Sequence, residues 1–137
     1  YVTVEEMAVH YIRVFRSAQI SAGDMSGDVD ILTYKMTAFI EKKYAQDISL
    51  GDLAEFVGFS TSYTSRYFHK HTGKSFSNFL TELRIEQAKK LLSESDRPVV
   101  TTIAKSVGYN NPQFFSRTFK ELTGMTPTEY AEKNRKL

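Results

Sequence analysis

The apolar residues between Ser75 and Ser95 recur every three or four positions, and the charged residues fall mostly between them. This spacing places the apolar side chains on one buried face of an α-helix and leaves the charged ones, Arg84 among them, to water. No glycine or proline interrupts the stretch, which predicts one helix that is ~30 Å long at ~1.5 Å per residue. The residues expected in the buried face are Phe76, Phe79, Leu80, Leu83, Ala88, Leu91 and Leu92.

Two segments with the same pattern of residues flank this helix. The sequence apolar-Ala-x-x-Val-Gly-aromatic begins at Leu53 and again at Ile103, and Ser-Arg-x-Phe begins at Ser65 and again at Ser116. The second segment has one additional residue in the predicted turn, where an insertion disturbs a fold least. Because two units are too few for a solenoid, we interpret the pattern as a duplicated motif.

Each segment has the pattern of a helix, a short turn that contains glycine and a second helix, as in a helix-turn-helix. Gly58 and Gly108 follow the first helix of each motif, at a position where we expect a left-handed backbone. The second helices are predicted to end at Gly73 and Gly124. The candidates for the N-cap of the second helix are Ser60 or Thr61 in the first motif and Asn110 or Asn111 in the second.

A helix before the motifs and a helix after them complete the predicted domain. Apolar spacing indicates the earlier helix over Ile31–Ala45. Ser49 with Asp52, and Thr126 with Glu129, have the spacing of a capping box at the start of a helix. The aromatic residues of the second helices that we expect to face the core are Tyr63, Tyr67, Phe68, Phe114 and Phe115.

Three stretches resemble the DNA-binding domain of the AraC/XylS family of bacterial transcription regulators: VGFSTSYTSRYFHKHTGKSF, LRIEQAKKLL and IAKSVGYNNPQFFSRTFKELTGMTPTEY. The resemblance covers about Ile31 to Lys136. In two places the chain departs from the family pattern, because Thr64 stands where a large apolar residue is common and Thr61 where proline is frequent. The resemblance implies an all-α fold of two helix-turn-helix subdomains joined by a long central helix, with an extra N-terminal helix in this chain.

The sequence predicts two regions. Residues 1–30 are expected to be an N-terminal helix, over Tyr1–Ile20, and a polar linker that belong to a truncated upstream region, since the chain does not begin with methionine. That helix is predicted to pack on a neighbouring domain or partner chain; the alternative is a coiled-coil or signalling helix between an absent sensor and the DNA-binding domain. Residues 31–137 are expected to be an AraC-type double helix-turn-helix DNA-binding domain.

A helix in the major groove contacts base edges through side chains near its N-terminal half, where arginine suits guanine, glutamine suits adenine and serine is permissive. The candidates for base contacts are Ser62, Ser65 and Arg66 in the first motif and Gln113, Ser116 and Arg117 in the second. The resemblance points to the same positions. For Arg66 and Arg117 the alternative is a salt bridge within the domain or a contact to phosphate alone.

Phosphate contacts are expected beside these residues, and the candidates are Thr61, Lys70, Asn111 and Lys120. No metal site is predicted, because His69 and His71 are two residues apart and do not share a helix face. We find no Gly-x-Ser-x-Gly sequence, glycine-rich phosphate loop or cluster of His, Cys and carboxylate residues. We therefore expect neither an enzyme nor a bound cofactor.

The charge of the chain is unevenly distributed. Residues 1–30 carry two arginines and five acidic side chains, a net charge of −3, whereas residues 31–137 carry sixteen basic and eleven acidic side chains, a net charge of +5. An excess of that size fits phosphate binding, although many domains have it. The absence of cysteine suits the reducing cytoplasm. The chain has no run of ~18 apolar residues, so no contact with a membrane is predicted.

The predicted function is that of a sequence-specific transcription regulator, an activator by family resemblance, which binds two successive major-groove segments with its two recognition helices. The expected partners are double-stranded promoter DNA, RNA polymerase and a second copy bound through the missing N-terminal region. A ~30 Å helix nearly equals one turn of B-DNA, ~34 Å, so one chain is expected to occupy an asymmetric site of about 20 base pairs. The alternative is a helical protein-interaction module that does not bind DNA.

Overall fold

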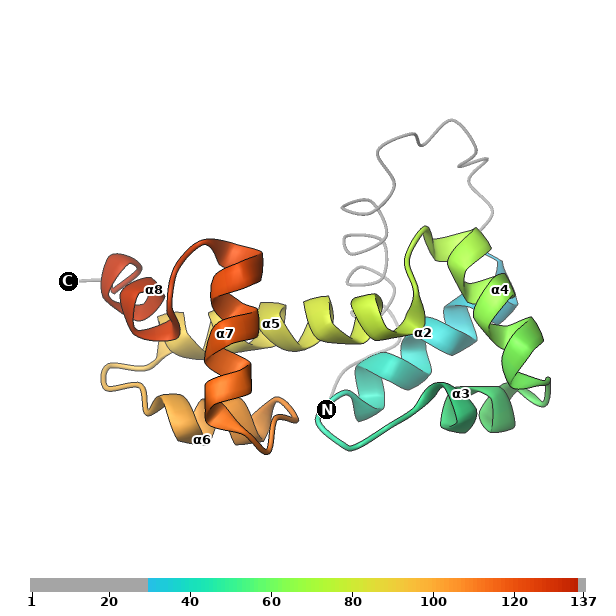
Figure 1. Ribbon diagram of the computed structural model, residues 1–137, viewed down its shortest axis with the longest axis horizontal. Helices are drawn as coiled ribbons and strands as arrows, with labels where there is room; N and C mark the ends of the chain where they lie inside the picture. Colours follow the sequence, from blue (N-terminus) through green and yellow to red (C-terminus); the bar gives the residue numbers. More distant parts are fainter. Residues whose placement is uncertain (1–29, 136–137) are drawn as a thin grey trace. The chain divides into compact units, whose positions relative to one another are not determined.

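The computed structural model describes residues 30–135, and over this range the chain forms helices and no strands (Figure 1). The helices are α2 (Ile31–Lys43), α3 (Leu50–Val57), α4 (Thr61–Thr72), α5 (Phe76–Glu94), α6 (Val100–Ser106), α7 (Pro112–Thr123) and α8 (Pro127–Lys133). They form two compact units, unit 1 with residues 30–43 and 48–79 and unit 2 with residues 44–47 and 80–135. The all-α prediction with two helix-turn-helix motifs is confirmed, and the helix predicted over residues 1–20 lies outside the described residues.

Unit 1 contains the first motif, which consists of α3, a turn and α4. The Oγ of Ser49 accepts the backbone N–H of Asp52, and the Asp52 carboxylate accepts the backbone N–H of Ser49 at 2.8 Å, so the predicted capping box is present. Gly58 follows α3 with a φ of 82°, a left-handed conformation that is costly for residues with a Cβ. Ser60 is the N-cap of α4 and Thr61 is its first residue, which decides between the two candidates.

The core of unit 1 includes Phe68 of α4, which is fully buried as predicted. The edges of the Phe76 and Phe79 rings meet the Phe68 ring at centroid distances of 6.5 and 5.3 Å. Burial of one such ring contributes about 1.5–3 kcal/mol to stability. The other fully or almost fully buried residues of the unit are Thr33, Met36, Thr37, Ile40, Leu53, Ala54, Thr64 and Thr72.

Aromatic side chains also form a row along one side of α4. The centroids of Phe59 and Tyr63 are 5.0 Å apart, those of Tyr63 and Tyr67 5.8 Å, and those of Tyr67 and His71 4.1 Å. Tyr67 is half-buried, but Tyr63 remains 40% exposed, so its predicted place in the core is wrong. The Tyr63 ring packs against its neighbours in the row, Phe59 and Tyr67, and not inside the core.

Unit 2 contains the second motif, which consists of α6, a turn and α7, followed by α8. Asn111 is the N-cap of α7, which decides between it and Asn110. Thr126 and Glu129 form the predicted capping box of α8, with the Thr126 N–H donating to the carboxylate at 2.9 Å. The core of the unit combines residues from four helices and the α6–α7 turn: Ile85, Ala88, Leu92, Ile103, Ala104, Val107, Tyr109, Phe115, Phe119 and Ala131.

Three apolar positions of unit 2 differ from the sequence prediction. Leu91 is 37% exposed although it was expected in the buried face of α5, whereas Ile85, outside the predicted face, is only 2% exposed. This helix is buried on more than one side, and a pattern with a single apolar face cannot describe it. Phe114 is 52% exposed, so its predicted core position is wrong, while that of the neighbouring Phe115 is confirmed.

The two motifs end with the same set of hydrogen bonds. In the first, the Thr72 Oγ1 lies 2.7 Å from the Phe68 carbonyl oxygen and accepts the Lys74 N–H at 3.2 Å. In the second, the Thr123 Oγ1 lies 2.7 Å from the Phe119 carbonyl oxygen and accepts the Met125 N–H at 3.2 Å. The duplication inferred from sequence is therefore a duplication of structure.

Candidate nucleic-acid interface

Two of the three predicted reading residues of α4 are small and one is long, and all three are exposed. Ser62, Ser65 and Arg66 are spaced by three and four, so they occupy one face of the helix. We call this reading face 1. Thr64 and Phe68 are buried on the other side of the same helix. The core therefore fixes the direction in which reading face 1 points.

The second motif repeats this arrangement on α7. Gln113 and Arg117 are exposed, Ser116 between them is half-buried, and together they form reading face 2. Phe115 and Phe119 are fully buried on the opposite side of α7. Gln113 stands where Ser62 stands in the first motif, so the two faces present different chemical groups at their first position.

The arginines of the two faces are not engaged within the described part of the chain. Between residues 30 and 135 neither Arg66 nor Arg117 has a carboxylate within 4.0 Å, the limit for an ion pair. This disfavours the alternative that either arginine serves as an internal salt bridge. A contact to phosphate alone remains as the alternative to a base contact.

The four predicted phosphate residues are exposed, but their surroundings differ. Thr61 is the first residue of α4 and Lys70 lies in its last turn. The Asn111 Oδ1 accepts the backbone N–H groups of Gln113 and Phe114 at 2.9 and 3.1 Å, so the part of this side chain that can donate to a phosphate is its NH₂ group. The charge of Lys120 contributes to the lowered pKa of Glu129, whose main cause is the pair of hydrogen bonds with Thr126.

Reading face 1 is held in place from the start of α2. The Tyr67 hydroxyl of α4 donates to the Asp30 carboxylate, which also accepts the Thr33 hydroxyl at 2.8 Å. Burial and this hydrogen bond raise the pKa of Tyr67 to about 12. Burial opposes ionisation of Asp30, but the hydrogen bonds from Tyr67 and Thr33 outweigh it and lower the Asp30 pKa.

The turn before reading face 2 is supported by Arg84 of α5, which the sequence pattern assigned to solvent. Its guanidinium donates to the carbonyl oxygens of Tyr44 and Gln46, both at 2.8 Å, and lies 5.5 Å from the centroid of the Tyr109 ring. Burial lowers the pKa of Arg84, although the nearby Tyr109 acts in the opposite direction. Glycine at position 108 leaves room for this guanidinium, since a Cβ there would lie 2.8 Å from the Arg84 Nε.

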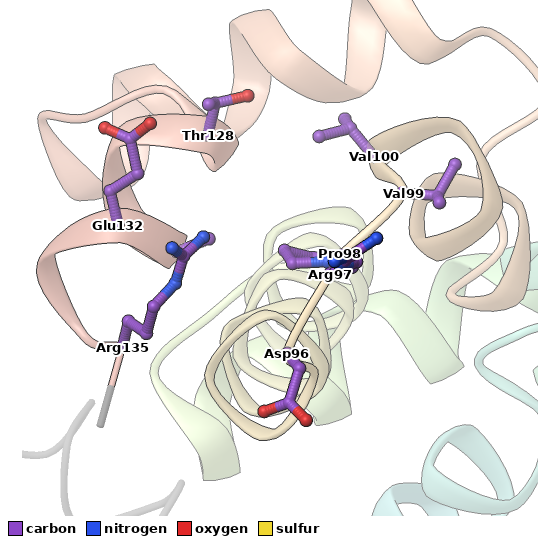
Figure 2. Close-up of a pocket in the computed structure, with 9 residues that line it drawn as sticks. Asp96, Arg97, Pro98, Val99, Val100, Thr128, Glu132 and Arg135 are labelled. Carbon is purple, nitrogen blue, oxygen red and sulfur yellow. The ribbon is translucent and has the colours of Figure 1, made fainter. Parts of the chain in front are cut away.

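A shallow pocket in unit 2 is lined by none of the predicted base-contacting residues. It is formed by the connection between α5 and α6 and by one side of α8 (Figure 2). Two acidic side chains, Asp96 and Glu132, and two basic ones, Arg97 and Arg135, line it together with Val99 and Val100. The opposite charges balance, and all four charged residues are exposed, so the pocket has no feature of a catalytic site.

Within residues 30–135 no three His, Cys, Asp or Glu side chains lie close enough to hold a metal ion. None of the described helices combines the length and the apolar character needed to cross a membrane.

Two equivalent helices, each fixed by a tight turn and each exposing a polar face whose arginine has no ion pair within residues 30–135, define a DNA-binding helix-turn-helix domain. The family comparison gives the same class, since the model of a helix-turn-helix domain of the AraC type matches residues 53–133. The chain belongs to the AraC-type helix-turn-helix family of transcription regulators.

The relatives are longer than this chain. An uncharacterised helix-turn-helix transcriptional regulator of Staphylococcus aureus is 35% identical over 123 residues, which are 89% of this chain and 16% of the relative. Another from Pseudoalteromonas carrageenovora is 40% identical over 92 residues, 67% of this chain and 54% of the relative. The chain thus corresponds to a part of these proteins.

Solved structures share the fold. The C-terminal domain of AraT, a response regulator from Geobacillus stearothermophilus, is similar with a TM-score of 0.74 and 32% identity, over 79% of this chain and 89% of that one. The DNA-binding domain of AdpA, a global transcriptional factor solved in complex with a target DNA, has a TM-score of 0.70 and 25% identity, over 77% of this chain and 93% of that one.

Proposed function

We propose that this chain is the DNA-binding part of a longer transcription activator and that both reading faces contact promoter DNA at once. The observation that carries the proposal is the pair of exposed arginines, Arg66 and Arg117, at equivalent positions of two equivalent helices, neither with an ion pair in the part of the chain that the structure describes. A planar guanidinium with free donors matches the O6 and N7 acceptors of guanine. The AdpA domain, a structural relative, was solved with a target DNA, which supports the same partner here.

The proposed binding site is asymmetric. Reading face 1 offers Ser62, Ser65 and Arg66, and reading face 2 offers Gln113, Ser116 and Arg117. Because the two sets differ, they prefer different bases, and one chain is expected to require two non-identical patches ~10 base pairs apart within about 20 base pairs. Thr61, Lys70, Asn111 and Lys120 are the proposed phosphate contacts.

The test is selection of bound sequences from a random pool of duplexes, followed by measurement of stoichiometry on the selected site. We expect an asymmetric consensus bound by one chain, with an affinity that falls as salt rises because counterions are released from DNA. A palindrome bound by two chains, each of which protects one groove segment, would contradict simultaneous binding by both faces.

Residues 31–137 are proposed to be sufficient for this activity, since both motifs and the basic excess lie there. Loss of tenfold or more in affinity on removal of residues 1–30 would contradict that boundary. Activation through RNA polymerase, and dimerisation through upstream residues, are proposed from the family alone. If no duplex in the pool is bound at any salt concentration, the chain is instead a helical protein-interaction module.

A further inference from the structure

Phe114 and Tyr63 are exposed aromatic residues at equivalent positions in the two motifs. Phe114 is 52% exposed and Tyr63 40%. Each ring lies beside the aromatic residue that follows the turn glycine, with Phe114 5.9 Å from Tyr109 and Tyr63 5.0 Å from Phe59 between centroids. The structure therefore holds an aromatic ring at the same place beside each reading face.

The position of Phe114 on α7 brings it next to the base-contacting residues. It is the third residue of the helix, directly after Gln113 and three before Arg117. At 3.6 residues per turn, its side chain points about 60° away from that of Arg117, and residues three apart are neighbours on a helix surface. Its ring thus borders reading face 2 within the first turn of the helix.

The chemistry of the ring restricts what it can contact. Phenylalanine has no side-chain hydrogen-bonding group, and an exposed ring gains chiefly by removing apolar surface from water. Along the floor of the major groove the apolar group of a base edge is the C5 methyl of thymine, and phenylalanine is one of the side chains that pack on it. Serine, glutamine and arginine, the residues of reading face 2, have no comparable apolar surface.

We infer that Phe114 is a specificity-determining residue that packs on the C5 methyl of a thymine at the edge of the base patch contacted by Gln113 and Arg117. The inference rests on the proposed function. Tyr63 has a hydroxyl at the tip of its ring, which suits a polar contact, so the thymine is assigned to Phe114 and not to both positions.

The experiment removes the C5 methyl group of thymine from the DNA and leaves the protein unaltered. With the site obtained from the random pool, each thymine of the second patch is replaced in turn by deoxyuridine, and the dissociation constant of the whole chain is measured by fluorescence anisotropy at fixed salt. We expect one replacement to weaken binding about fourfold, which corresponds to loss of one buried methyl group at ~0.8 kcal/mol. The others are expected to have little effect.

Two protein variants test whether Phe114 is the residue that senses the thymine methyl group. Phe114→Ala is expected to bind the thymine and deoxyuridine duplexes equally. The matched control is Leu122→Ala, since Leu122 is 50% exposed on the same helix but near its C-terminal end, and it should keep the fourfold preference. Circular dichroism verifies that both variants fold, and the measurement with unaltered protein does not depend on either.

The outcomes separate this inference from the proposed function. If the chain selects and binds a site but no thymine of the second patch shows a deoxyuridine effect, the inference is wrong and the proposed function stands. The same holds if Phe114→Ala keeps the full preference for thymine. If no duplex is bound, the proposed function itself has failed.

Discussion

Thr64 of α4 is a buried hydroxyl without a partner, and its replacement by valine should stabilise the protein. The side chain is 0% exposed, and its Oγ1 has no hydrogen bond in the part of the chain that the structure describes. Burial of an unpaired polar group costs about 1–3 kcal/mol. Valine has nearly the same shape and helix propensity as threonine but no group to leave unpaired.

The expected gain follows from these terms. Thr64→Val removes the cost of the unpaired hydroxyl and adds a methyl group to the core, so we expect unit 1 to become more stable by ~1–2 kcal/mol. For a domain of this size that corresponds to a rise in melting temperature of about 4 °C or more. The resemblance to the AraC/XylS family agrees, since a large apolar residue is common at this position.

The matched control is Thr72→Val, at a buried threonine on the same helix whose hydroxyl is paired. The Thr72 Oγ1 lies 2.7 Å from the Phe68 carbonyl oxygen and accepts the Lys74 N–H at 3.2 Å. Its replacement leaves that N–H without its partner and should cost ~1–2 kcal/mol. The two substitutions have the same chemistry, so opposite signs would isolate the effect of the hydrogen bonds.

The assay must report on unit 1, because a chain of two units need not unfold in one step. Native-state hydrogen exchange, followed by mass spectrometry on peptides from α4, measures the local free energy of opening. The reasoning would be refuted if Thr64→Val speeds exchange in α4, or if the two valine variants change it equally.

Three further predictions follow from the same structure. Arg66→Ala should weaken binding to the selected site by ~1–3 kcal/mol and relax the base preference at one base pair, whereas Lys70→Ala should weaken binding to all duplexes alike and reduce the slope of log affinity against log salt by about one. Fluorescence anisotropy on selected and random duplexes distinguishes the two effects. Equal losses of affinity on both kinds of duplex would make Arg66 a phosphate contact. Gly108→Ala should cost more in urea unfolding than the ~1 kcal/mol expected for Gly58→Ala, because φ is positive at both glycines but only at Gly108 does a Cβ meet neighbouring atoms, at 2.8 Å. Because the pKa of Tyr67 is raised from 10.0 to about 12, the folded state favours its protonated form, and the resulting stability should be present below pH 10 and lost between pH 10 and 12. Unfolding of Tyr67→Phe across this range should lack that loss.

The sequence predicted the fold well where one residue type has one physical role. The glycines at the ends of helices, the capping boxes at Ser49 and Thr126 and the buried Phe68 were all predicted correctly. Each of these depends on local backbone geometry or on apolar spacing. The alternatives at the starts of α4 and α7 stayed open because two adjacent polar residues were equally suited to cap, and only the hydrogen bonds of Ser60 and Asn111 distinguish them.

The sequence failed where a side chain has both an apolar and a polar part, or where a helix is covered on several sides. Arg84 was assigned to water from its charge, but its donors pair with two backbone carbonyls and its guanidinium lies over Tyr109. Tyr63 and Phe114 were assigned to the core from their rings, but they border the reading faces. For the candidate site, the structure shows that the predicted base-contacting residues are exposed except for the half-buried Ser116, and their contacts to DNA remain proposals.

The duplication separates what the two motifs share from what they do not. One shared feature is internal: the equivalent hydrogen bonds of Thr72 and Thr123 close α4 and α7 with the same distances. The two motifs differ in the core, where Thr64 corresponds to Phe115, and on the surface, where reading face 1 has Ser62 and reading face 2 has Gln113 at the corresponding place. A packed interior tolerates few changes, whereas exposed positions change at little cost in stability. Under the proposed function, in which both faces contact DNA at once, the exchange of Ser62 for Gln113 at equivalent exposed positions makes the preferred DNA sequence asymmetric at little cost to the fold.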